Sequence, residues 1–230
     1  MGGMARTVQA EVYTVRREAF IETAQRLMQA KGYEQMSIQD VLDQLEASRG
    51  AFYHYFDSKQ ALLEAVIERM VEAGLGSVAP VVDDPRLTAL EKLKGLFGGI
   101  GQWKTERKAL VLSLLPVWTS DQNAIVREKL RHGLSGRIVP LLSRIIEQGI
   151  AEGDFAVTKP IETAEVFLMM LLGFQEIATD LFLERQANAI GYDDVVERFN
   201  GYTDAFERIL GAPRGSIDLM DDTVMRAWFG

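Results

Sequence analysis

Apolar residues recur along this chain with the spacing of helices, and the pattern is clearest between residues 37 and 70. Positions i, i+3, i+4 and i+7 of one stripe are filled by Ile38, Val41, Leu42 and Leu45. Such a stripe predicts a helix that is buried along one face. A short second helix is expected after Ser48, with Phe52 and Phe56 on its buried side, and a longer third helix follows. The pattern therefore predicts three consecutive helices, the first two separated by only a few residues.

Polar residues at the predicted helix starts support these limits. Ser37 stands three residues before Asp40, the arrangement of a capping box. Ser48 is placed to cap the second helix, and Asp57, with Gln60 three residues later, to cap the third. Two short helices joined by a tight turn are the layout of a helix-turn-helix.

The rest of the chain also predicts helices and no strands. Expected helical segments are 87–103, 106–118, 123–149, 161–185 and 192–210. A loop is expected from Gly74 to Pro85, because glycines, prolines and aspartates cluster there. The predicted fold class is all-α, with an N-terminal three-helix domain over residues 1–72, a larger helical domain over 73–212 and a tail over 213–230. The apolar residues of the tail indicate that it packs against another surface.

Composition narrows the class of protein. The chain has 230 residues, of which 47% are hydrophobic and 25% charged, as in ordinary globular proteins. The absence of cysteine excludes disulfides, thiol catalysis and cysteine-bound zinc. The longest apolar run, Val166 to Gly173, is too short to span a bilayer, and the N-terminus lacks an apolar signal core. A cytoplasmic location without a membrane partner is therefore expected.

The net charge of −8 is a poor guide to nucleic-acid binding. Residues 1–60 contain seven Lys/Arg and eight Asp/Glu, so most of the acidity lies further along the chain. Phosphate contacts depend on local charge rather than on the sum over the chain. The overall acidity does not exclude a nucleic-acid contact by the N-terminal domain.

The segment GYEQMSIQDVLDQLEASRGAFYHYFDSKQALL resembles the DNA-binding domain of the TetR family of bacterial transcriptional regulators. The resemblance covers about residues 16–70 and includes the Gly-Tyr turn, the Ser-Ile helix start and the Ser-x-Gly-x-Phe-Tyr-His-Tyr-Phe segment. One position departs from the family pattern, because Glu46 stands in the turn where glycine is usual. Glycine adopts positive φ without steric cost, whereas Glu46 requires about 1 kcal/mol for a left-handed conformation or a different turn.

The resemblance implies that the second helix enters the major groove of DNA. The residues expected to contact DNA are Ser37, Ser48, Arg49, Gly50, Tyr53, His54 and Lys59. Ser37 and Ser48 lie at helix N-termini, which favour phosphates, and Lys59 lies in the first turn of the third helix. Tyr53 and His54 are suited to phosphate contacts, Arg49 to guanine edges, and Gly50 to close approach.

The larger domain is expected to bind a small, largely apolar effector and to form a homodimer. Candidate lining residues are the aromatic, leucine and methionine residues Phe97, Trp103, Leu114, Trp118, Met169, Met170 and Phe174. The resemblance implies that the last two long helices pair with their copies in a second subunit. The protein would then be a one-component repressor, released by its effector from a near-palindromic operator.

Few residues of this chain are candidates for enzyme catalysis. The chain has only two histidines, His54 and His132, and shows no phosphate-binding loop, zinc-protease motif or dinucleotide fingerprint. No catalytic residue, cofactor or metal site is expected. Two alternatives stay open. One is a dimeric helical small-molecule-binding protein that no longer binds DNA. The other is an activator, or a regulator that responds to a protein partner.

Overall fold

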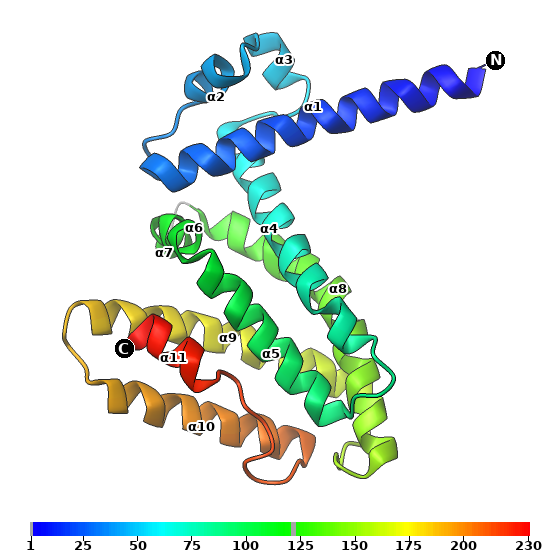
Figure 1. Ribbon diagram of the computed structural model, residues 1–230, viewed down its shortest axis with the longest axis vertical. Helices are drawn as coiled ribbons and strands as arrows, with labels where there is room; N and C mark the ends of the chain where they lie inside the picture. The colour runs from blue at the N-terminus through cyan, green and yellow to red at the C-terminus, as the bar shows by residue number, and fades with distance from the viewer. Residues whose placement is uncertain (1, 121–122) are drawn as a thin grey trace. The chain divides into compact units, whose positions relative to one another are not determined.

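The computed structural model describes residues 2–120 and 123–230, and every regular element in these residues is a helix (Figure 1). The helices are α1 (Gly2–Lys31), α2 (Ile38–Leu45), α3 (Arg49–Tyr53), α4 (Lys59–Val82), α5 (Ala89–Glu106), α6 (Lys108–Ser113), α7 (Leu115–Thr119), α8 (Ala124–Glu152), α9 (Pro160–Gln186), α10 (Tyr192–Leu210) and α11 (Asp222–Phe229). The all-α prediction is confirmed.

The helices group into two compact units. The N-terminal unit comprises Met1–Ala73 and Arg107–Leu130, and the C-terminal unit comprises Gly74–Glu106 and Arg131–Gly230. Two helices, α4 and α8, have residues in both units. The division after Ala73 lies beside the expected limit at residue 72, but the 107–130 segment groups with the N-terminal unit. The limits of the functional domains stay a prediction.

Aromatic rings fill the core of the N-terminal unit. Phe52 of α3 is fully buried, and its ring lies 5.8 Å from the rings of Phe20 on α1 and Phe56 after α3. Val41 and Leu42 of α2 are buried in the same cluster. The apolar stripe predicted for α2 therefore faces this core, and its burial fixes the two short helices on α1 and α4.

The prediction of a loop from Gly74 to Pro85 is wrong over most of this segment. Helix α4 continues through Gly74 and ends at Val82, with Pro80 inside it. The reason is packing within the C-terminal unit. A Cβ atom on Gly95 or Gly99 of α5 would collide with the side chains of α4, so these glycines let the two helices approach closely. Burial of Val78 in this contact outweighs the local preference for a loop.

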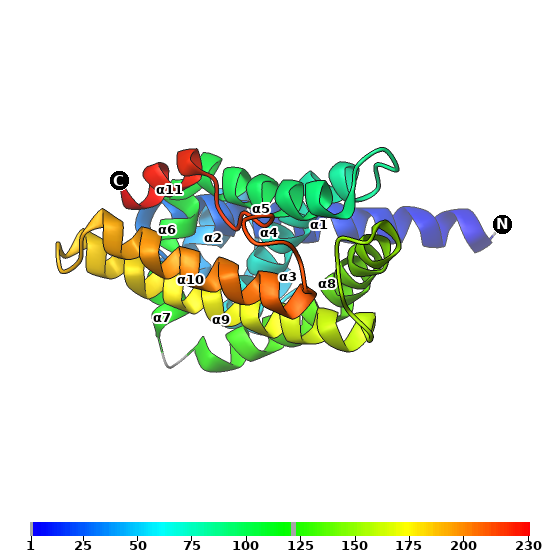
Figure 2. The same cartoon turned by 90° about the horizontal axis from the view of Figure 1, so that it is seen from below.

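Helices α9 and α10 lie side by side, and α11 packs on α5 and α9 (Figures 1 and 2). The tail is thus ordered, as its apolar residues indicated, with Met225 and Phe229 buried within the C-terminal unit. Among the described residues, α9 is the one helix long and apolar enough to cross a membrane. This is weak support for a span, because core helices of the same length also qualify, and Phe167 and Phe174 of α9 are buried.

Candidate nucleic-acid interface

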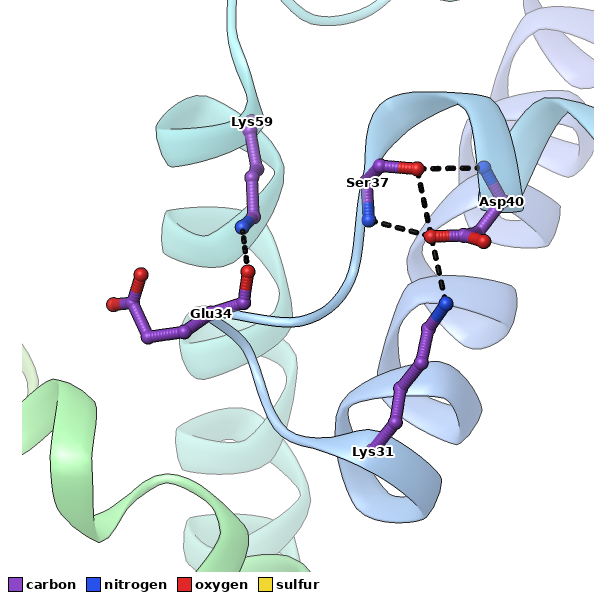
Figure 3. A network of polar contacts seen from close by, with 5 residues as sticks. All are labelled: Lys31, Glu34, Ser37, Asp40 and Lys59. Carbon is purple, nitrogen blue, oxygen red and sulfur yellow. Dashed lines mark hydrogen bonds and ion pairs between the residues drawn. The ribbon is translucent and has the colours of Figure 1, made fainter.

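The start of α2 is held by a compact polar network (Figure 3). The backbone N–H of Asp40 donates to Ser37 Oγ at 3.1 Å, and the backbone N–H of Ser37 donates to Asp40 Oδ2 at 2.7 Å. The predicted capping box is therefore confirmed. Lys31 at the end of α1 adds an ion pair of 2.7 Å to Asp40. The hydrogen bonds from Lys31 and then Ser37 hold the pKa of Asp40 well below its ordinary value.

The turn between α2 and α3 has the left-handed conformation. Glu46 adopts φ 49° and ψ 42°. The N–H of Ala47 donates to the Leu42 carbonyl at 3.0 Å, and that of Glu46 lies 3.5 Å from the Asp43 carbonyl, the two contacts of a Schellman motif. This chain therefore keeps the sharp turn that glycine usually provides, at the steric cost of a side chain.

Most of the side chains of α3 predicted to contact DNA point to solvent. Ser48 caps the helix by accepting a hydrogen bond from Ala51 N at 3.2 Å. Arg49 is exposed, and no ion pair holds it among the described residues. Tyr53 is 55% exposed. Gly50 is also exposed, and a Cβ there would meet only Ser48 Oγ at 3.9 Å. The packing of the chain itself therefore does not require glycine at position 50, whereas close approach by an external partner would.

Lys59 occupies the first turn of α4 but is directed at the loop before α2 (Figure 3). Its Nζ donates to the Glu34 carbonyl at 3.3 Å and lies 4.2 Å from the centre of the Tyr33 ring. Burial lowers the pKa of Lys59, while the charge of Glu34 opposes this shift. Lys59 thus ties the α1–α2 loop to α4. The prediction that Asp57 caps α4 is wrong. Ser58 caps it instead, because Ser58 Oγ accepts the N–H of Ala61 at 3.0 Å.

Tyr13 of α1 belongs to the same surface and was missed by sequence reasoning. Its ring lies 5.6 Å from that of the exposed His54 and 4.8 Å from that of Tyr55. Tyr13 is 40% exposed, so it extends the aromatic surface of α3 onto α1. Its position seven residues before Phe20 places it on the face of α1 that packs on α3, which is the available sequence signal.

The residues expected to line an effector site are divided between the units. Leu114 and Trp118 lie in the N-terminal unit, where Leu114 packs on the core. The other five lie in the C-terminal unit: Phe97, Trp103, Met169, Met170 and Phe174. Phe97 stacks on Phe167 at 6.1 Å, and Phe174 contacts Phe199 at 4.8 Å. Met169 is half exposed on α9. Their role in ligand binding stays a prediction.

The capped α2, the sharp turn and the exposed α3 define a helix-turn-helix protein. Comparison with known proteins identifies the family. A family model described as "Bacterial regulatory proteins, tetR family" matches residues 20–66, and one described as "Tetracyclin repressor-like, C-terminal domain" matches residues 117–189. The chain belongs to the TetR family of bacterial regulatory proteins. It is therefore a transcriptional regulator and not an enzyme.

Individual relatives agree with this assignment. The HTH-type transcriptional regulator YfiR of Bacillus subtilis is 27% identical over 180 residues, which are 76% of this chain and 85% of that protein. A regulator from Lactococcus lactis is 41% identical over 64 residues, 27% of this chain and 33% of that protein. A TetR transcription regulator from Haloarcula marismortui has a similar fold, with a TM-score of 0.59 at 18% identity, over 86% of this chain and 97% of that one.

Proposed function

We propose that this regulator is a cytoplasmic, homodimeric repressor that binds a near-palindromic operator and is released by a small, largely apolar effector. The observation that supports operator binding most directly is the solvent-facing surface of α3. Arg49 and Gly50 stand at the start of that helix, and Tyr53 and His54 at its end. One side of the helix is therefore free to enter the major groove, while Phe52 holds the other side in the core.

Each exposed residue has a distinct proposed role. The planar guanidinium of Arg49 matches the O6/N7 edge of guanine, so Arg49 is proposed to read sequence. Ser48 accepts a bond from Ala51, which leaves its hydroxyl proton for a phosphate oxygen. Tyr53 and His54 are proposed to donate to phosphates as well. Ser37 and Lys59 are proposed to contact phosphates as well, although both also bind groups of the chain itself.

Operator binding is tested by mobility shift with DNA from upstream of the regulator's own gene. Affinity should fall steeply with salt, because each neutralised phosphate releases counterions and contributes a slope of about −0.9 in log K against log salt. Arg49→Ala should reduce discrimination between operator and mutated operator by about 1–3 kcal/mol. The exposed Arg86→Ala in the C-terminal unit is the matched control. If no neighbouring fragment shows a salt-sensitive shift, the alternative without DNA binding is favoured.

The homodimer is supported by apolar side chains on α9 that the single chain leaves exposed. Ile161 is 57% exposed, Val166 49% and Met169 50%. On α10, an open hollow of about 640 Å³ lies around Arg198 and Tyr202. Exposed apolar side chains on one helix are typical of an interface. A second subunit that covers α9 and α10 would also place two recognition helices on one operator.

Sedimentation at micromolar concentration tests the dimer. The wild type should sediment as a dimer, and Val166→Glu should shift it to monomer because a charge is buried in the interface. Glu165→Gln, at the exposed neighbouring position, should leave the dimer intact. A wild-type monomer would rule out the dimeric arrangement. An operator-driven reporter, repressed or activated on expression of the protein, separates a repressor from an activator.

A further inference from the structure

Helix α5 contains two lysines whose ammonium groups reach into the C-terminal unit and end on a glutamine. Near the beginning of the helix, Lys92 Nζ donates to Gln148 Oε1 at 2.8 Å. Near its end, Lys104 Nζ donates to Gln175 Oε1 at 2.6 Å. The helix and the type of bond are the same in both cases. The two sites differ in whether a carboxylate accompanies the glutamine.

The site of Lys92 is completed by a carboxylate. Gln148 donates from Nε2 to Glu152 at 2.6 Å, and the backbone N–H of Ala89 donates to the same carboxylate at 2.8 Å. The bond from Ala89, then that from Gln148, lowers the pKa of Glu152, and the positive charge of Lys92 contributes. The positive charge is therefore balanced within the chain.

The site of Lys104 has no such carboxylate. In the described part of the chain, the neutral amide of Gln175 is the one hydrogen-bond partner of its ammonium. Burial alone lowers the pKa of Lys104 to about 8. The group is still mostly protonated at neutral pH, so a positive charge is held among α5 and α9 without a counter-charge. Such a charge is unfavourable in the fold of the protein alone.

The elements around Lys104 carry aromatic side chains. The ring of Phe97 stacks on Phe167 between α5 and α9, and the buried Phe174 precedes Gln175. Helix α11 lies along α5, where Trp228 Nε1 donates to Thr105 Oγ1 at 2.9 Å. Helix α11 also contacts α9. Lys104 retains partial solvent exposure although its ammonium is enclosed.

We propose that Lys104 and Gln175 bind the carboxylate of the effector, so that the effector is an apolar organic acid with one negative charge. This inference rests on the proposed effector control and names the chemical class of the ligand. The carboxylate would accept a charge-assisted bond from Lys104 Nζ, and the amide NH2 of Gln175 would donate to its second oxygen. The apolar part would lie against the aromatic rings. One ammonium balances a monoanion, whereas an alcohol would leave its charge uncompensated and an amine would be repelled.

Binding of matched acids and alcohols to the full-length protein tests this proposal. The probes are decanoate with decan-1-ol and 4-phenylbutyrate with 4-phenylbutan-1-ol, followed by tryptophan fluorescence and calorimetry. The wild type should bind at least one acid about ten-fold or more tightly than its alcohol, the effect of one charge-assisted hydrogen bond. Lys104→Met should bind the acid about ten-fold more weakly than the wild type does, and should keep the wild-type affinity for the alcohol. Lys92→Met, on the same helix, should behave as the wild type.

Several outcomes would overturn the proposal: no acid binds the wild type, acid and alcohol bind equally, or Lys104→Met binds the acid as well as the wild type does. Lys104→Arg keeps the charge and should keep the preference for the acid, which separates a lost charge from a disturbed fold. If Lys104→Met fails to fold, the acid-to-alcohol ratio of the wild type and of Lys104→Arg decides.

The same samples are added to the operator complex, which separates this inference from the proposed function. If alcohols release the DNA and acids do not bind, the acid ligand is wrong and effector control stands. If acids bind through Lys104 without release of the DNA, the acid site stands and effector control fails.

Discussion

The two units of this regulator differ in how their buried charges are balanced. In the N-terminal unit, Lys31, Asp40 and Ser37 satisfy one another, and the aromatic core around Phe52 is closed. In the C-terminal unit, the buried ammonium of Lys104 has one hydrogen-bond partner among the described residues, an amide, and α9 leaves apolar side chains such as Val166 exposed. The first unit also leaves apolar side chains exposed, such as Val15 on α1 and Ile125 on α8, so the contrast between the units lies in charge. We propose that an effector and a second subunit complete the second unit.

The largest change in stability is expected from a substitution in the core of the N-terminal unit. Phe52→Ala removes a fully buried ring that contacts Phe20 and Phe56, and it should lower the free energy of unfolding by about 3–5 kcal/mol. Urea unfolding followed by circular dichroism measures this loss. Tyr53→Ala, the adjacent exposed position, should change stability by less than about 0.5 kcal/mol while weakening operator binding. Equal losses for the two variants would contradict the assignment of buried and DNA-facing sides of α3.

The opposite sign is expected in the C-terminal unit, where Lys104→Met should stabilise the protein. The pKa of Lys104 is lowered from 10.5 to about 8, so at neutral pH the buried charge costs roughly 3 kcal/mol. Between pH 8 and 10.5 the unfolded chain holds a proton on Lys104 that the folded chain has lost, so wild-type stability gains with rising pH. The difference between the variant and the wild type should therefore be largest below pH 8 and shrink towards pH 10.5.

Urea unfolding across pH 7–10.5 measures that difference, with Lys92→Met as the control. Lys92 already has Glu152 within its network, so Lys92→Met should not show the same stabilisation. If Lys104→Met is less stable than the wild type at every pH, its ammonium is a structural group and the contrast between the units fails.

The sequence predicted the N-terminal unit well because its determinants are local. Helix caps and apolar spacing correctly predicted α2 and α3 of this unit. Local sequence also predicted α10 of the C-terminal unit with its observed limits, Tyr192 and Leu210. The errors arose where distant packing decides. Gly74 and Pro80 suggested a loop, but the contact of α4 with α5 keeps this segment helical. Burial of Lys104 beside Gln175 has no sequence signal, since it depends on two helices far apart along the chain.

A smaller effect is expected from the capping box of α2. Ser37→Ala removes the acceptor of the Asp40 N–H and one of the donors to the Asp40 carboxylate, and should cost about 1 kcal/mol. Ser37→Thr should retain most of that stability. Because the bonds from Lys31 and Ser37 lower the pKa of Asp40, their stabilisation is present above its ordinary value of 3.8 and is lost as the pH falls below it. The difference between Ser37→Ala and Ser37→Thr in thermal unfolding should therefore decrease between pH 6 and pH 2.5, and a difference independent of pH would contradict the role of Asp40.

The smallest effect is expected at the turn that joins α2 to α3. Glu46→Gly relieves a positive φ of 49° but adds freedom to the unfolded chain, so the net stabilisation should be about 0.5–1 kcal/mol in thermal unfolding. Glu46→Ala keeps the strain and removes the charge, so the difference between the two variants isolates the backbone contribution. Both variants should bind operator DNA more tightly at low salt, since each removes an exposed carboxylate close to Ser48 and Arg49. If Glu46→Ala leaves DNA affinity unchanged while Glu46→Gly raises it, the turn limits binding through its geometry rather than its charge.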